Sequence, residues 1–126
     1  MPRGLETLLA VLAFGVCLGG PGAADPLLRS FSVCAGRLSA LMEEQWMFDG
    51  PGSERTASEL GAMVSLIEAS MAEGEGRRVL DRRIKSKVAY RALLFQARFR
   101  ADPEAAKQAA TRAETLAAEC REMILG

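Results

Sequence analysis

Apolar residues recur at intervals of three or four in every long segment after residue 24, and no segment alternates apolar and polar residues. Intervals of three or four place side chains on one side of a helix, whereas a half-buried strand requires alternation. The pattern therefore predicts an all-α fold with four helices and no sheet. Glycine, proline and capping residues separate the helices.

The first two predicted helices cover about residues 32–48 and the segment that follows Ser53. The first ends because glycines and a proline occupy 49–52, where helical geometry is costly. The second begins with Ser53 as its N-cap and ends at Gly74 and Gly76. We expect one apolar stripe on each helix to face the core. The stripes are Cys34, Leu38, Leu41 and Met42 on the first helix, and Leu60, Met63, Leu66, Ile67 and Met71 on the second.

The third and fourth predicted helices cover about residues 77–100 and the segment from Asp102 to about Leu125. Asp102 is a good N-cap, and Pro103 suits the first helical position. The half of the fourth stripe that contains alanine is expected to approach a neighbouring helix closely. The stripes are Leu80, Ile84, Val88, Ala92, Phe95 and Phe99 on the third helix, and Ala106, Ala109, Ala113, Leu116, Cys120 and Met123 on the fourth.

Two cysteines, Cys34 and Cys120, lie near opposite ends of the helical segment and on apolar stripes. In an up-down bundle of four helices with short connections, the start of the first helix and the end of the last lie at the same end. We therefore predict a disulfide between them that joins the first and last helices. The chain-entropy argument gives about 4 to 5 kcal/mol of stabilisation for a loop of roughly 87 residues.

The N-terminal segment resembles a secretory signal peptide, with Arg3 ahead of an apolar run at 8–20 and small residues up to Ala24. The run is shorter than the roughly 20 apolar residues needed to span a bilayer, so an anchor is disfavoured. We expect residues 1–24 to be cleaved, leaving 25–126 as a single helical domain with no stable membrane span. Arginine greatly outnumbers lysine, a bias typical of GC-rich bacterial genomes, and this favours a periplasmic or secreted location.

The helix predicted at 77–100 is strongly basic, with nine arginines and lysines against Asp81 alone. Helical spacing places Arg78, Arg82 and Lys85 within one arc. One interpretation is internal charge balance, with this helix packed between the second and fourth, whose acids offset it. The other is docking to a protein or an anionic envelope partner. Tyr90 is the only candidate for base stacking interleaved with these basic residues, and this, together with the expected export, argues against nucleic acid.

A second candidate surface is the group Trp46, Met47 and Phe48 at the end of the first helix. A tryptophan beside a turn most often covers the end of a bundle, with its ring over the core. If exposed, it would be an anchor for a partner, because tryptophan is enriched in interface hot spots. Phe99, with its neighbouring arginines, is predicted at the same end, where a mixed aromatic and cationic site can form.

Catalysis receives little support, because the chain contains no histidine, no CxxC motif and no glycine-rich phosphate loop. Glu43 and Glu44 are adjacent and point apart, and Glu119 with Glu122 fits a solvated helix face better than a metal site. We therefore expect no enzyme, no cofactor and no metal. The expected function is that of a periplasmic interaction or accessory protein that acts by binding. The alternative is a small-ligand or metal carrier, and neither a monomer nor a dimer is favoured.

Overall fold

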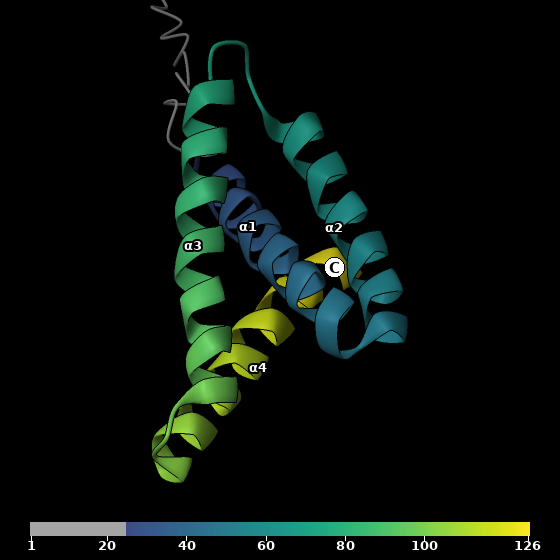
Figure 1. Cartoon of the computed structure of the whole chain (residues 1–126). Helices are drawn as coiled ribbons and strands as arrows, with labels where there is room; N and C mark the ends of the chain where they lie inside the picture. The colour runs from purple at the N-terminus through teal and green to yellow at the C-terminus, as the bar shows by residue number, and fades with distance from the viewer. Residues whose placement is uncertain (1–24) are drawn as a thin grey trace, which may run out of the picture.

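The computed structural model describes residues 25–126, and within this range the chain is helical with no strand (Figure 1). The helices are α1 (Asp25–Phe48), α2 (Gly50–Ser70), α3 (Gly76–Phe99) and α4 (Pro103–Leu125). This confirms the predicted fold class, a bundle of four helices. The predicted signal peptide, at 1–24, lies outside the described residues.

The boundary between α3 and α4 is the one that the sequence predicted best. The side chain of Asp102 accepts a hydrogen bond from the backbone N–H of Glu104 at 3.1 Å, and Pro103 occupies the first turn of α4. Aspartate at this position satisfies an N–H group that the helix leaves without a partner. The turn is therefore encoded locally.

Two other boundaries differ from their predictions. α1 begins at Asp25 rather than near residue 32, and the extra turns bury Leu28 and Phe31. α2 begins at Gly50, because the side chain of Asp49 accepts a hydrogen bond from the N–H of Gly52 at 3.1 Å. Ser53 is consequently a buried residue within α2 and not its N-cap. A proline in the first turn of a helix is well tolerated, so the prolines of both segments fit these starts.

α1 is the central helix, with α2 and α3 packed against it, and α4 runs back along α3 until its second half reaches α1 and α2. α2 and α3 diverge from the loop that joins them, and the turn between α3 and α4 projects past the end of α1 (Figure 1). The prediction that the third helix lies between the second and the fourth is therefore wrong, because α3 packs against α1 and α4.

The core has two parts. The larger lies around the disulfide and takes side chains from all four helices, among them Leu28, Leu38, Met63, Val79 and Cys120. The smaller lies between α1, α3 and α4 and is built on Ala40, Tyr90, Leu94 and Ala113. The four helices therefore share one well-filled core, and the projecting half of α3 and α4 has a thinner one.

The predicted disulfide is confirmed: Cys34 and Cys120 are bonded, with their Cα atoms 5.4 Å apart and 86 positions apart in sequence. Both cysteines are buried in the larger core. The bond joins α1 to α4, the first helix to the last, so it closes almost the whole described chain into one loop.

The apolar stripe predicted for α3 is on the wrong side of the helix. Val79, Tyr90 and Leu94 face the core, whereas the predicted residues face outward. The side that faces α1 is determined by a close crossing at Gly36, since a Cβ added there would lie 2.4 Å from the carbonyl oxygen of Arg83. Only glycine allows α1 to approach α3 so closely at this point.

Candidate functional site

The outer face of α3 is an exposed apolar stripe that runs the length of the helix. Its large side chains, which the sequence pattern assigned to the core, are each more than half exposed. Successive members are three or four residues apart, so they form one continuous line. The outer face consists of Leu80, Ile84, Val88, Ala92, Phe95 and Phe99.

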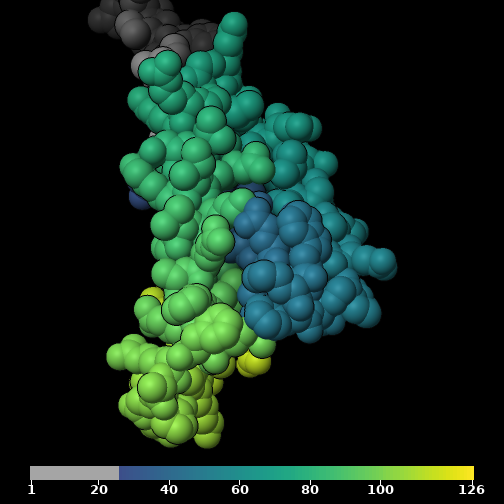
Figure 2. Space-filling view, viewed as in Figure 1, coloured from purple at the N-terminus to yellow at the C-terminus, as the bar shows by residue number. Residues whose placement is uncertain are grey.

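The end of α1 meets the lower half of α3, where Figure 2 shows the two segments side by side. The ring of Phe48 meets that of Phe99 edge-on, with centroids 6.4 Å apart, and Phe99 lies 4.8 Å from Phe95. The guanidinium of Arg98 stands 3.6 Å from the centre of the Phe48 ring. We call these four residues the aromatic corner. The mixed aromatic and cationic site predicted at this end is thus assembled.

The three predicted residues at the end of α1 are all exposed, Trp46 by 63%, Met47 by 71% and Phe48 by 48%. The expectation that Trp46 covers the end of the core is wrong. α1 continues as a helix to Phe48 and α2 begins at Gly50, and the indole is left 63% exposed. An exposed tryptophan at this position is instead what we expect of an anchor that binds a partner.

A groove of about 270 Å³ lies between α1 and α3 at the aromatic corner. Its apolar lining includes Met47, Phe48, Leu94 and Phe95. The charged side chains beside them are Arg91, Arg98, Glu43 and Glu44, and both glutamates are in ion pairs. This volume can take about one large side chain or one acyl-chain segment, below the roughly 300 Å³ typical of small-molecule sites. The corner therefore extends the outer face of α3 and is not an enclosed binding cavity.

Ion pairs offset part of the charge of α3. Lys85 pairs with Asp81 at 2.7 Å within the helix, Lys87 pairs with Glu43, and Nε of Arg98 lies 2.8 Å from Glu44. The positive charge of α3 is therefore partly balanced within the molecule, as one interpretation predicted. The acids that other helices contribute belong to α1, however, and not to α2 or α4. Exposed pairs of this kind contribute only about 0 to 1 kcal/mol each.

Several arginines of α3 make no ion pair within the described residues, among them Arg77, Arg78, Arg82 and Arg91. Arg78 and Lys85 of the predicted basic arc are exposed, Arg82 is half-buried, and Lys85 is occupied by Asp81. Arg77 and Arg91 were not part of that arc, yet helical spacing places them beside Ile84 and Phe95 on the outer face. Part of the free positive charge of α3, that of Arg77 and Arg91, therefore lies among its exposed apolar side chains.

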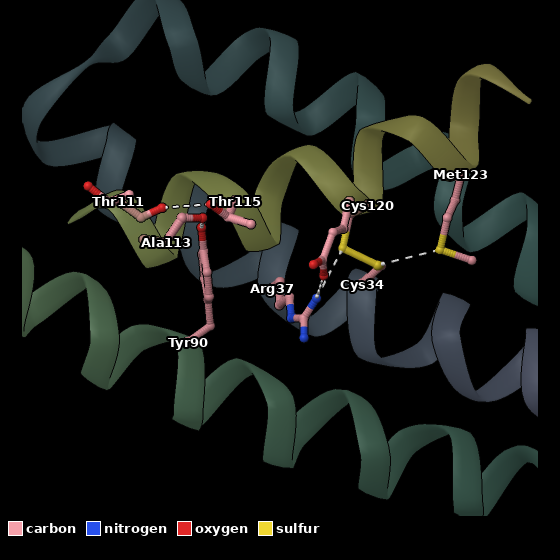
Figure 3. Close-up of polar contacts among 9 residues, drawn as sticks. Cys34, Arg37, Tyr90, Thr111, Ala113, Thr115, Cys120 and Met123 are labelled. Atoms are coloured by element: carbon pink, nitrogen blue, oxygen red, sulfur yellow. Dashed lines mark hydrogen bonds and ion pairs between the residues drawn. A yellow bond between two sulfur atoms is a disulfide. The ribbon is translucent and has the colours of Figure 1, made fainter. Parts of the chain in front are cut away.

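Tyr90 is the main buried polar group behind this face. Its hydroxyl donates a hydrogen bond to the carbonyl oxygen of Ala113 on α4 at 2.6 Å (Figure 3). Burial raises the pKa of Tyr90 from 10.0 to about 12, and the positive charges of Arg121 and Arg37 oppose this shift. The hydroxyl reaches the backbone of α4 at an alanine, whose small side chain leaves room for the ring.

Polar groups near the disulfide have structural partners. Nη1 of Arg37 lies 3.5 Å from a carboxylate oxygen of Glu119 and 3.8 Å from Sγ of Cys120 (Figure 3). Glu119 is therefore in an ion pair with Arg37. Residues 25–126 contain no group of three or more His, Cys, Asp or Glu side chains able to hold a metal ion. Nothing in this region assembles a catalytic group.

The chain matches no family model, and neither the curated proteins nor the solved structures provide a match. The helices described at 25–126 include none that is both long enough and apolar enough to cross a bilayer. A role must therefore be argued from the surface itself.

Proposed function

We propose that this chain is an exported protein, periplasmic or secreted, that acts by binding an anionic partner and not by catalysis. The proposed binding surface is the aromatic corner, the exposed Trp46 and Met47 that precede Phe48 on α1, and the outer face of α3. The observation that carries the proposal is the exposure of large apolar side chains in one continuous line, because contiguous exposed apolar surface marks interaction sites. Basic side chains along that line favour an anionic partner.

Export is supported by the pattern of residues 1–24 and by the disulfide. A basic start, an apolar stretch and small residues up to Ala24 are typical of a signal peptide. Disulfides persist mainly in oxidising compartments, and Cys34 and Cys120 form one. Intact mass spectrometry of the native protein tests this. We expect a chain that begins at Asp25 and gains two hydrogens on reduction, whereas an intact N-terminus with free thiols would overturn export.

Oxidative footprinting in an envelope extract tests the binding surface. Trp46 and Met47 are exposed and oxidise readily, so a bound partner at this end slows their oxidation relative to the purified protein. Met71, exposed at the end of α2, is the internal control and should oxidise equally in both samples. Equal rates for Trp46 and Met47 in extract and in buffer would contradict the proposed surface.

A small-ligand carrier remains the second candidate. A groove of about 420 Å³ runs between α1, α3 and α4 beside Tyr90, and the buried Oε1 of Gln45, which lines it, has no hydrogen-bond partner. Buried polar atoms of this kind normally have a partner. Native mass spectrometry of the protein purified from its source would reveal a copurified ligand. If the mass is that of the protein without a ligand, and oxidation is slowed in the extract, the interaction role remains the proposal.

A further inference from the structure

We propose that the outer face of α3 binds to an anionic lipid surface, with its apolar side chains in the interfacial layer and its arginines at the phosphates. This inference rests on the proposed function and names the partner that the same surface would bind. It is argued from the shape of the face, from its charge and from the aromatic corner.

The shape of the face suits a flat surface. α3 is 24 residues long, about 36 Å at 1.5 Å per residue. At Ile84 and Val88 its exposed stripe is opposite the side that packs on α1 and forms a ridge, and at Phe95 and Phe99 the stripe continues beside the end of α1. A partner helix usually binds in a groove between two helices. The grooves on its two sides, of about 270 Å³ beside Phe95 and about 430 Å³ beside Ala92, each follow only part of the helix, whereas a bilayer can receive the whole ridge.

The charge of the face disfavours a second copy and favours an anion. Asp81 is the only acid in α3, and it is occupied by Lys85. Arg77 and Arg91 lie among the apolar side chains of the stripe, so two α3 faces brought together would oppose like charges. Helices that bind at a membrane interface combine apolar side chains with many lysines and arginines. Each basic side chain near an anionic leaflet adds to the affinity.

The aromatic corner supplies the third observation. Phe48, Phe95 and Phe99 cluster at one end of the ridge, and Trp46 and Met47 stand exposed on the same turn of α1. Aromatic side chains, tryptophan above all, favour the boundary between headgroups and acyl chains. The long aliphatic stem of Arg98 beside them can reach toward phosphates while its ring contact is kept.

Vesicle binding by the native, exported protein tests the proposal. Vesicles of phosphatidylcholine alone are compared with vesicles of phosphatidylcholine and phosphatidylglycerol, and the wild type and all variants have the same N-terminus, which intact mass spectrometry verifies. Ile84→Ser with Val88→Ser removes apolar side chains from the ridge. The matched control is Leu27→Ser with Leu125→Ser, two exposed leucines at the ends of α1 and α4.

A second pair of variants tests the charge. Arg77→Gln with Arg91→Gln is compared with Arg29→Gln with Lys107→Gln, which changes the net charge equally at exposed positions of α1 and α4. We expect the wild type to prefer anionic vesicles and to bind more weakly as salt is added. The arginine variant should bind them about 30-fold more weakly, roughly fivefold per basic residue. The serine variant should lose at least about tenfold.

The controls should bind within about twofold of the wild type, because the affinity comes from one face. Equal losses in test and control variants, or no loss in either test variant, would overturn the proposal. A dimer in sedimentation that the serine variant abolishes, without vesicle binding, would assign the face to a second copy. If the protein does not bind vesicles but its oxidation is slowed in the envelope extract, the proposed function stands and the partner is a protein.

Discussion

The core around the disulfide and the outer face of α3 contain the same kinds of side chain in opposite environments. Leu38 and Met63 are fully buried where four helices meet, whereas Ile84 and Val88 line a surface that no other element covers. The difference shows that apolar periodicity marks surfaces able to pack and does not say which of them packs within the chain. Stability should therefore depend on the first region, and binding on the second.

Opening the disulfide should produce the largest change, since it closes the loop from Cys34 to Cys120. We expect reduction to lower the unfolding free energy by about 4 to 5 kcal/mol at most, because strain usually subtracts from the entropic value. Helicity below the melting temperature should persist, because the apolar core remains. Circular dichroism melts with and without reductant measure this, and an unchanged melting temperature would refute the stabilising role.

Leucine truncations compare the two regions directly. Leu38→Ala in the core should cost about 2 to 5 kcal/mol, as buried leucines do. Leu80→Ala, the same deletion on the outer face of α3, should stay within about 0.5 kcal/mol. Chemical denaturation of both variants gives the two values. The predicted stripe of the fourth helix implied that Leu116 is as buried as Leu38. Leu116 is only half-buried, so the loss of unfolding free energy in Leu116→Ala should fall between the losses of the other two variants.

Glycine substitutions sharpen the comparison at the crossing of α1 and α3. A Cβ at Gly36 would lie 1.8 Å from Oγ of Ser86 and 2.4 Å from a backbone oxygen, so Gly36→Ala should cost about 1 to 3 kcal/mol. Gly61 is also within a helix but has nothing within 4 Å of such a Cβ. Gly61→Ala should therefore stabilise by about 0.4 to 1 kcal/mol. Equal urea midpoints for the two variants would contradict the close crossing.

Tyr90 gives the most direct readout of the inner face of α3. It is the only tyrosine, so phenolate absorbance reports this group alone, and we expect a midpoint near 12 in the folded protein. The unfolded chain loses this proton near 10.0, so stability should fall as pH rises from 10 toward 12 and be unaffected below. A midpoint of 10 in the folded state would contradict burial.

Tyr90→Phe is the matched variant. It removes the hydrogen bond to Ala113 and should cost about 0.5 to 1.5 kcal/mol at neutral pH. In this variant the unfolding free energy should not fall above pH 10 in the way that ionisation of Tyr90 causes in the wild type. The two effects together separate the hydrogen bond from the ionisation.

Much of the fold was predictable, because its signals are local. Asp102 and Pro103 mark a helix start in any context. Cys34 and Cys120, the two cysteines left once the predicted signal peptide with Cys17 is removed, lie on apolar stripes, which predicts their pairing. The start of α1 was missed although Asp25 and Pro26 repeat the same aspartate–proline signal. The candidate site was predicted in part: the meeting of Phe48, Arg98 and Phe99 followed from antiparallel helices with short turns.

By itself, the sequence determined the helical class, the helix breaks and the disulfide, since periodicity, caps and paired cysteines act over a few residues or through chain topology. Only the tertiary structure decided which side of α3 is buried. That helix is apolar on two opposite sides, with Tyr90 and Leu94 on one and Val88 and Phe95 on the other. The close approach at Gly36 selects the first side, and such a contact between distant segments leaves no trace in the spacing of residues along α3.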